Sequence, residues 1–537
     1  MAIGEMPLVG LAAIMALTAS AWSDRVAATV RATKSDGAEA WFSAPAPAVG
    51  SAQQQAESRS SSTSTAQAGT PPPASASDRP APVPAQPSSA NAYRAPTPAE
   101  ERVAESWIAR HGRVLSGATP TAPQLAPIVR RLSGATIIGL GEVTHGTHED
   151  QAFKVALIEA LVRAGAIDTV AIEANRSAIA AFDRWVVGGP GELEPLVRSE
   201  SFFRVARTDE FAGLLRWLRD WNKTARRPVH MVGIDLQDGL RDAEEALGPI
   251  TVADPAAADR IRARLAPMPT APAGERPADF MRWSMGASKE QFAASRAAVA
   301  EIDAWYEGHA AQRGDAALAA GRDAARGAVQ GFAFAAPFNG GDFAKVTPAE
   351  FRRRDDLMAE NLLALPAGGH RVALWAHQGH VLADVPAVIR QSGYNSLGLR
   401  VRDAIGPAYR TLAVTYSRAS VLLTTISGEV HAIPVVDDKP ADLTNDGPQT
   451  AGAEFGRAAP ARATALWIDL GEAKREPTLA GWRDGALWKG EAGWAYDPAK
   501  WQKGPAEEDA TPIGSGFDVL VWFRRMTPSH RWAGEFH

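Results

Sequence analysis

The sequence contains no cysteine. This absence excludes a disulfide framework, thiolate zinc sites, iron–sulfur clusters and a cysteine nucleophile. Any metal ion would need histidine, aspartate or glutamate ligands. The chain also lacks an excess of basic residues, because 56 Lys and Arg stand against 61 Asp and Glu and give a net charge of −5. We therefore expect no nucleic-acid partner.

Several catalytic motifs are missing as well. The chain has no Gly-x-Ser-x-Gly nucleophile elbow and no P-loop, and Ala152 stands where a zincin would place its second histidine after His148. Gly139-x-Gly141 follows a predicted strand and imitates a dinucleotide fingerprint, but Thr144 replaces the third glycine and Glu142 would repel a pyrophosphate. The sequence therefore predicts no cofactor.

The N-terminal apolar run, Pro7 to Ala21, is too short to span a bilayer comfortably, since about 15 residues at about 1.5 Å each fall short of a core of ~30 Å. It resembles the core of a signal peptide, but the segment before it has Glu5 and no Lys or Arg. Export to the periplasm or the outside and a cytoplasmic location therefore both stay open. We divide the chain into this apolar segment (1–23), an Ala/Pro/Ser-rich linker predicted to be disordered (24–100) and a folded domain (101–537).

The folded domain is predicted to be α/β, with a central, mostly parallel sheet flanked by helices. Its near-continuous apolar segments alternate with amphipathic helices, which is typical of a parallel sheet covered on both faces. Residues 254–335 are alanine-rich and have helical periodicity, so we expect a helical insertion there. The predicted strands are 136–140, 169–172, 229–234, 371–375, 411–415, 466–470 and 519–523.

Two predicted helices begin with a capping box. Thr147-x-x-Asp150 precedes a helix with a buried apolar stripe, and Thr347-x-x-Glu350 precedes a second helix with Pro348 at its first position. The dipole at a helix start favours acidic residues, so a structural role is expected for Asp150.

Ionisable side chains follow four of the predicted strands. Glu142 and His145 come after the first strand, Glu173 after the second, Asp235 after the third, and His377-x-x-His380 after the fourth. Ligands bind at the carboxyl ends of strands in open α/β sheets. One buried histidine or glutamate is more often structural. Four independent strand ends favour a functional site.

Most of these residues belong to four blocks with a recognisable order. The blocks are Gly141-Glu142-x-x-His145-Gly146-x-x-Glu149 with Lys154, then Glu173, then Arg354-Asp355-x-x-Met358-Ala359-Glu360-Asn361, and Trp375-Ala376-His377-x-x-His380. With these blocks, from about Trp107 to Thr527, the chain resembles the erythromycin esterase family. The resemblance implies an α/β core with added helices and a deep cleft, and hydrolysis of an ester without a serine nucleophile or a metal. The domain 101–537 would then be catalytic.

These residues allow a mechanism for a macrolide lactone or a related bulky ester, with water as the nucleophile. Hydrolysis needs a base for the water and stabilisation of the oxyanion. We expect His145 to be the base, with a pKa of about 6 to 7, oriented by Glu142 or Glu173. We expect His377, from the far side of the sheet, to bind the oxyanion or to protonate the leaving alkoxide.

Supporting or substrate-binding roles are expected for Lys154, His380, Glu149 and Arg354. Lys154 stands where family members often have arginine, and lysine lacks the planar guanidinium. Asp355 shares an apolar helix face and is expected to pair with Arg354 or Arg353. His148 is expected to be peripheral, and the oligomeric state is open.

Three alternatives remain at this point. Glu142 could merely accept backbone amides in the turn after its strand. The chain could be a metallohydrolase, because acidic and imidazole side chains are acceptable ligands for zinc or manganese. It could also be a non-catalytic or biosynthetic accessory binding protein, since a fold does not fix a function. The candidate metal ligands are Glu142, His145, Glu173, His377 and His380.

Overall fold

The computed structural model describes residues 94–266, 276–309, 315–341, 345–384, 395–422, 424–425, 435–436, 441–492, 495–496 and 511–532. The predicted N-terminal segment 1–23 and most of the predicted linker 24–100 lie outside the described residues. The end of that linker range is helical, since α3 (Pro98–His111) begins there behind the capping residue Thr97. In the described part, no helix combines the length and the apolar character that a membrane crossing requires.

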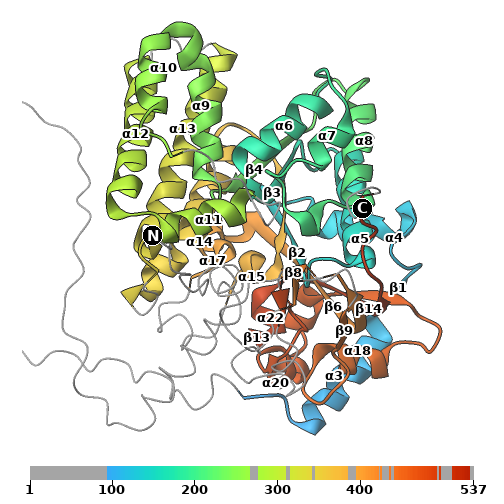
Figure 1. The fold of residues 1–537 in the computed structure, drawn as a ribbon. Helices are drawn as coiled ribbons and strands as arrows, with labels where there is room; N and C mark the ends of the chain where they lie inside the picture. The colour runs from blue at the N-terminus through green and yellow to red at the C-terminus, as the bar shows by residue number, and fades with distance from the viewer. Residues whose placement is uncertain are drawn as a thin grey trace, which may run out of the picture.

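The fold is α/β with a mixed, mostly parallel main sheet, as the sequence predicts (Figure 1). Among the described residues the main sheet has nine strands, in the order β1-β10-β14-β6-β2-β5-β3-β4, with β9 paired to β6. The six strands from β14 to β4 run parallel, whereas β1, β10 and β9 are antiparallel to their neighbours. The strands are β1 (Arg113–Leu115), β2 (Ile137–Glu142), β3 (Thr169–Asn175), β4 (His230–Asp235), β5 (Val372–His377), β6 (Tyr409–Val421), β9 (Ala441–Thr444), β10 (Ala465–Asp469) and β14 (Val519–Met526).

Both faces of the central strands are buried. Along β5, Val372 and Leu374 belong to one hydrophobic core, whereas Ala373 and Trp375 belong to the other. Successive side chains of a strand point to opposite faces, so each core covers one face of the sheet. Gly141 in β2 is required by close packing, because a Cβ there would lie 2.6 Å from the Cβ of Gln378.

Helices cover the two faces and position the ends of the strands. On one face lie α4 (Ala122–Leu132), α5 (His148–Arg163), α6 (Arg176–Val186) and α8 (Asp209–Asn222). On the other face lie α14 (Pro348–Ala367), the short α15 (Gln378–Val381) and α17 (Leu397–Ile405).

The described residues of the range 254–335, for which the sequence predicts a helical insertion, form four α-helices. They are α10 (Pro255–Arg262), α11 (Arg276–Gly286), α12 (Lys289–Gly308) and α13 (Ala316–Ala335). The preceding helix, α9 (Gly239–Ala253), packs against α10 and α13 and belongs to the same group, at the upper left of Figure 1. Apolar side chains of this group, such as Phe332, are continuous with the core on one face of the sheet.

The capping box predicted at Thr347 is confirmed, whereas the one predicted at Thr147 is wrong. Thr347 and Glu350 exchange both hydrogen bonds of the box, with Pro348 in the first turn of α14. Thr147 occupies the N-cap position of α5, but its side chain makes no capping hydrogen bond. The amide of Val143 and the ammonium of Lys154, one turn further along α5, hold the carboxylate of Asp150 instead.

Candidate functional site

The carboxyl ends of four neighbouring strands bring the predicted site residues to one edge of the sheet. Glu142 ends β2, Asp235 ends β4, His377 ends β5, and Glu173 lies near the end of β3. In the pairing of β2 with β5, Glu142 stands directly opposite His377. The expectation that His377 comes from the far side of the sheet is therefore wrong, because β5 is the strand next to β2.

His145 and Glu142 form a hydrogen-bonded pair. His145 Nδ1 lies 3.1 Å from Glu142 Oε1, and Trp375 Nε1 donates to Glu142 Oε2. The side chain of His145 is 21% exposed and that of Glu142 only 4%, so the imidazole faces solvent from a buried carboxylate. Glu142 engages Nδ1 and leaves Nε2 of His145 for other partners.

The structure contradicts the alternative in which Glu142 only accepts hydrogen bonds from backbone amides. The amide of Val143 donates to Asp150 Oδ2, over 3.0 Å. Both oxygens of Glu142 face side chains instead.

Charges fix the protonation of this pair. Burial raises the pKa of Glu142, but His145, Lys154 and the indole of Trp375 outweigh it and lower the pKa to about 2. Burial lowers the pKa of His145, but the carboxylates of Glu142 and Glu173 outweigh it and raise the pKa above the ordinary 6.5. Near neutral pH the pair holds an ionised carboxylate and an imidazole that takes up a proton readily.

His377 is a neutral imidazole with an unused donor. Its Nδ1 accepts from the amide of Gly379 over 3.3 Å, so the proton of the neutral ring is assigned to Nε2. Among the described residues this buried Nε2 has no hydrogen-bond partner. Burial, together with His145 and His380, lowers the pKa of His377 to about 4. The rings of His145 and His377 lie 5.6 Å apart between centroids, so the donor lies close to the candidate base.

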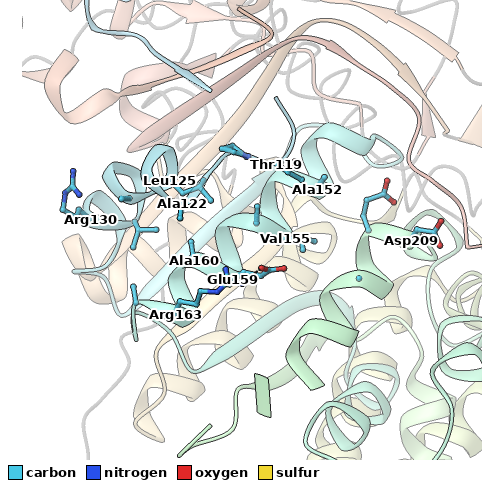
Figure 2. A pocket seen from close by; sticks show the side chains of 17 residues that line it. Thr119, Ala122, Leu125, Arg130, Ala152, Val155, Glu159, Ala160, Arg163 and Asp209 are labelled. Carbon is cyan, nitrogen blue, oxygen red and sulfur yellow. Dashed lines mark hydrogen bonds and ion pairs between the residues drawn. The ribbon is translucent and has the colours of Figure 1, made fainter. Parts of the chain in front are cut away.

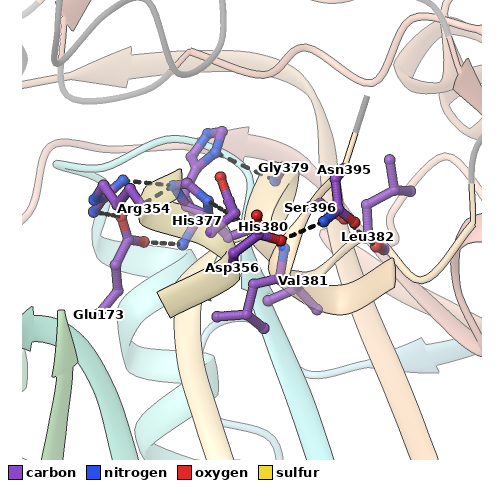
Figure 3. A network of polar contacts seen from close by, with 12 residues as sticks. Glu173, Arg354, Asp356, His377, Gly379, His380, Val381, Leu382, Asn395 and Ser396 are labelled. Atoms are coloured by element: carbon purple, nitrogen blue, oxygen red, sulfur yellow. Dashed lines mark hydrogen bonds and ion pairs between the residues drawn. The ribbon is translucent and has the colours of Figure 1, made fainter. Parts of the chain in front are cut away.

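Glu173 belongs to a buried ionic network rather than to the His145 pair (Figure 3). Its Oε1 accepts from Arg354 Nη2 over 2.7 Å, and its Oε2 accepts from the amide of His377 over 2.8 Å. Arg354 also donates to Asp235, over 2.6 and 3.0 Å. Of the two carboxylates expected to orient His145, Glu142 does so, whereas Glu173 ties Arg354 to the end of β5.

His380 joins this network from α15. Its Nδ1 lies 2.6 Å from Asp355 Oδ1, and its Nε2 lies 3.2 Å from Glu173 Oε1 and 3.0 Å from Arg354 Nη1. Burial lowers the pKa of His380, but Asp355 and Glu173 outweigh it and raise the pKa to about 10. The network holds three carboxylates, those of Glu173, Asp235 and Asp355. With Arg354 and a protonated His380 their net charge is −1, whereas with a neutral His380 it is −2. We therefore assign both protons to His380 and treat the approach of Arg354 to Nε2 as a contact between two donors.

The predicted pairing of Asp355 with a neighbouring arginine is wrong. Asp355 Oδ1 accepts from His380 and from the amide of Leu397, over 2.6 and 3.0 Å. Arg354 projects instead to the strand ends, where Asp235 and Glu173 bind it. The helix turn separates the two adjacent side chains.

Lys154 and Glu149 lie apart from the exposed side of His145. Lys154 is fully buried, pairs with Asp150 and lies 5.6 Å from the centroid of the Trp375 ring. It contributes positive charge beneath Glu142 and has no contact with solvent. Glu149 accepts from the amide and the hydroxyl of Thr527, over 2.6 and 2.9 Å, and joins α5 to the end of β14.

A cavity of about 720 Å³ lies among α4, α5 and α8 (Figure 2). Apolar side chains such as Leu125 and Val155 line it, together with Glu159, Arg163 and Glu210, and Asp209 lies at one end. None of the predicted site residues lines it. The candidate site therefore rests on the strand ends and not on this cavity.

Sequence reasoning missed several partners of the site. Trp375 stands in a recognised block and Asp235 follows a predicted strand, but the sequence assigns a partner to neither, and it assigns the wrong partner to Asp355. Glu491, which accepts from Gln378 Nε2 over 2.9 Å, had no signal. Its carboxylate lies close enough to His377 to oppose the lowering of the pKa of that ring.

Comparisons with known proteins concern the family and the fold of the chain. The family model described as erythromycin esterase matches residues 165–526. This range contains Glu173, Arg354, His377 and His380, and it begins after Glu142 and His145. YbfO of Bacillus subtilis (strain 168), a protein named as a hydrolase, is 27% identical over 144 residues, which are 26% of this chain and 30% of YbfO.

Three solved structures share the fold. A Bacillus cereus protein has a TM-score of 0.64 at 20% identity and covers 80% of this chain and 99% of its own. A succinoglycan biosynthesis protein has a TM-score of 0.62 at 14% identity, over 81% of this chain and 100% of its own. A histidine-to-asparagine variant of the erythromycin esterase EreC, in its open conformation, has a TM-score of 0.55 at 15% identity, over 78% of this chain and 97% of its own. At these identities the structures establish the fold alone.

Proposed function

Because the chain belongs to the erythromycin esterase family, we propose that it is a hydrolase that cleaves a carboxylic ester with water as the nucleophile. The observation that carries this proposal is the Glu142–His145 pair, a partly exposed imidazole on a buried, ionised carboxylate. An imidazole held in this way is a general base for water. A macrolide lactone or a related bulky ester is the proposed substrate, on the strength of the family alone.

His145 acts on both sides of the reaction. Its Nε2 takes a proton from water while the water oxygen bonds to the ester carbonyl carbon, and the carbonyl electrons move onto oxygen. Glu142 stabilises the imidazolium, as an acid does in a catalytic triad. When the tetrahedral intermediate collapses, the bond from carbon to the alkoxide oxygen breaks, and the imidazolium returns its proton to that oxygen.

His377 supplies the hydrogen bond to the oxyanion. Its Nε2–H is a buried donor with no partner among the described residues, beside the ring of the proposed base. A donor aimed at developing negative charge contributes most in a site of low dielectric constant. The low pKa of His377 keeps the ring neutral, so it does not compete with His145 for the proton.

Arg354, Glu173 and His380 are proposed to position the end of β5. Glu173 accepts from the amide of His377, and Arg354 and His380 hold Glu173 in turn. Lys154 supports Glu142 through its charge. Glu149, bound to Thr527, has no part in this mechanism.

The alternative metal centre has weaker support. Among the described residues, no three of its five candidate ligands bring their ligand atoms within 4.8 Å of one another. The carboxylate oxygens of two of these candidate ligands already accept hydrogen bonds. Glu142 accepts from Trp375 and His145, and Glu173 accepts from Arg354 and from the amide of His377. A binding protein without activity would keep the same pocket residues, so only an assay separates it from an enzyme.

The test is a screen of the full-length protein against macrolides and simple aryl esters, with the metal content of each preparation measured. We expect turnover that persists after chelation, and a loss of about 10²- to 10⁴-fold in His145→Ala. The matched control is Glu149→Gln, which should turn over normally. Near-normal turnover in His145→Ala would reject the mechanism, and activity that disappears with the metal would favour the metallohydrolase. Ligand binding without any turnover would favour the accessory role.

A further inference from the structure

A second group of ionisable side chains lies outside the strand-end site. It consists of His148 at the start of α5, Glu210 in the first turn of α8, and His530 in the segment after β14. One ligand atom from each lies within 4.8 Å of the others. His148 Nδ1 is 2.6 Å and His530 Nδ1 3.3 Å from the same oxygen, Glu210 Oε1.

The carboxylate at the centre of this group is buried and only partly used. The side chain of Glu210 is 4% exposed. Its Oε1 accepts from His148 and from the amide of His530, whereas its Oε2 is buried and has no hydrogen-bond partner among the described residues. A buried carboxylate oxygen without a partner is costly unless another group satisfies it.

The backbone holds the three residues in place. The amide of His148 donates to Thr527 O over 2.8 Å, and the amide of Asp209 donates to His530 O over 2.7 Å. On either side, isolated bridges pair Thr147 with Pro528 and Thr208 with Arg531. The ligands are therefore preorganised by three segments that are far apart in sequence.

We propose that His148, Glu210 and His530 bind a divalent late transition-metal ion of the zinc class. Two imidazoles and one carboxylate are the ligand types that zinc accepts, and three protein ligands leave a position for water. Zinc bonds of about 2.0–2.2 Å place neighbouring ligand atoms roughly 3.3 Å apart. The distance from His530 to Glu210 already has this value, and the distance from His148 must lengthen as the metal replaces the shared proton.

Two features bear on the strength of this site. The starts of α5 and α8 place positive helix-dipole ends near the ion, which opposes binding. The negative charge of Glu210 favours it, and Glu210 is also one of the residues that line the cavity of Figure 2. A bound ion would join α5 and α8 to the segment after β14, and would stabilise the folded state by mass action.

The experiment is calorimetric titration of Zn²⁺ into the full-length, EDTA-treated and dialysed protein. We expect one saturable equivalent and a rise in melting temperature on addition of zinc. Glu210→Gln and His530→Ala should each weaken this equivalent by at least about 10- to 100-fold, the loss seen even for groups that only support metal ligands. His530 is 61% exposed, so its truncation leaves the fold intact.

The matched control is His230→Ala. His230 Nδ1 also lies beside a carboxylate, 3.2 Å from Asp183 Oδ1, but in the described part of the chain no third ligand atom lies within 4.8 Å of both. This variant should bind zinc as the wild type does. Unchanged binding in both Glu210→Gln and His530→Ala, or no saturable equivalent in the wild type, would overturn the proposal. The group would then be a proton-linked hydrogen-bond cluster only.

Discussion

At the scale of single residues, Glu142 sets the pH at which the proposed base works. The carboxylates of Glu142 and Glu173 raise the pKa of His145 against the effect of burial. Since the base must be neutral, kcat/KM should rise with pH through an apparent pKa above about 6.5, the ordinary value for histidine. Glu142→Gln removes the nearest negative charge, so this apparent pKa should fall, and turnover should decrease by on the order of 10²-fold.

The check is a pH–rate profile of both proteins on the same ester. Glu149→Gln removes a carboxylate that is bound to Thr527, so its profile should follow that of the wild type. A profile of Glu142→Gln with an unshifted pKa would mean that another group sets the protonation of the base.

At the scale of elements, the start of α5 depends on one buried ion pair. Asp150 and Lys154 are both fully buried, one turn apart, and Asp150 also accepts from the amide of Val143 at the end of β2. Breaking a buried pair from one side leaves an uncompensated charge, so Lys154→Met should lower the free energy of unfolding by about 3–5 kcal/mol. Asp150→Asn keeps an acceptor for the amide of Val143 but leaves the buried ammonium of Lys154 without a counter-charge. It should lower the free energy of unfolding by a similar amount.

The double variant Asp150→Asn/Lys154→Met leaves neither charge behind. We expect it to be less destabilised than the sum of the two single variants, by more than about 0.5 kcal/mol in a denaturant double-mutant cycle. Additive losses would show that the two charges do not interact and that α5 is anchored in another way.

The elements also show how far the sequence leads. The seven predicted strands are present, because a continuous apolar segment between helices is a local pattern that burial on both faces requires. The three-residue β1 and the edge strand β9 have no such pattern, and were missed. The box expected at Thr147 did not form, because the amide of Val143 and the ammonium of Lys154 take the carboxylate that would have capped the helix.

For the candidate site as well, some features could be predicted from the sequence and others could not. Its position at the strand ends follows from topology, and so could be predicted from the order of strands and helices. The partners could not. Whether Glu142 or Glu173 binds His145, and whether Asp355 binds Arg354 or His380, depends on strand register and on the direction of each side chain. Neither is encoded in local spacing.

At the scale of the whole molecule, stability should depend on where the chain is shortened. Residues 24–93 are rich in Ala, Pro and Ser and have few groups with which to build a core, and the apolar segment before them resembles a signal peptide, so deleting residues 2–93 should leave melting temperature and turnover unchanged. A deletion that continues through α3 removes Trp107 and Ile108, which belong to the core, and should lower the melting temperature markedly. Circular dichroism melts of both truncations provide the check. A large loss in the shorter deletion would place part of the 1–93 region in the folded unit.

The ionic network around Arg354 should make the stability of the whole molecule depend on pH. It connects the ends of β3 and β4 with α14 and α15, and its titrating member in the alkaline range is His380, with a pKa of about 10. The unfolded pKa is about 6.5, so the folded state binds this proton more tightly. The stabilisation is fully present below about pH 6.5 and is lost as the pH rises towards 10, at about 1.4 kcal/mol per pH unit. His380→Gln removes this proton, so between pH 7 and 9 its free energy of unfolding should fall less steeply than that of the wild type, by that slope. Urea denaturation of both proteins at several pH values measures the difference, and titrations that they share cancel in it. Parallel pH dependences would mean that His380 is neutral in the folded protein, and that Arg354 alone compensates Glu173 and Asp235.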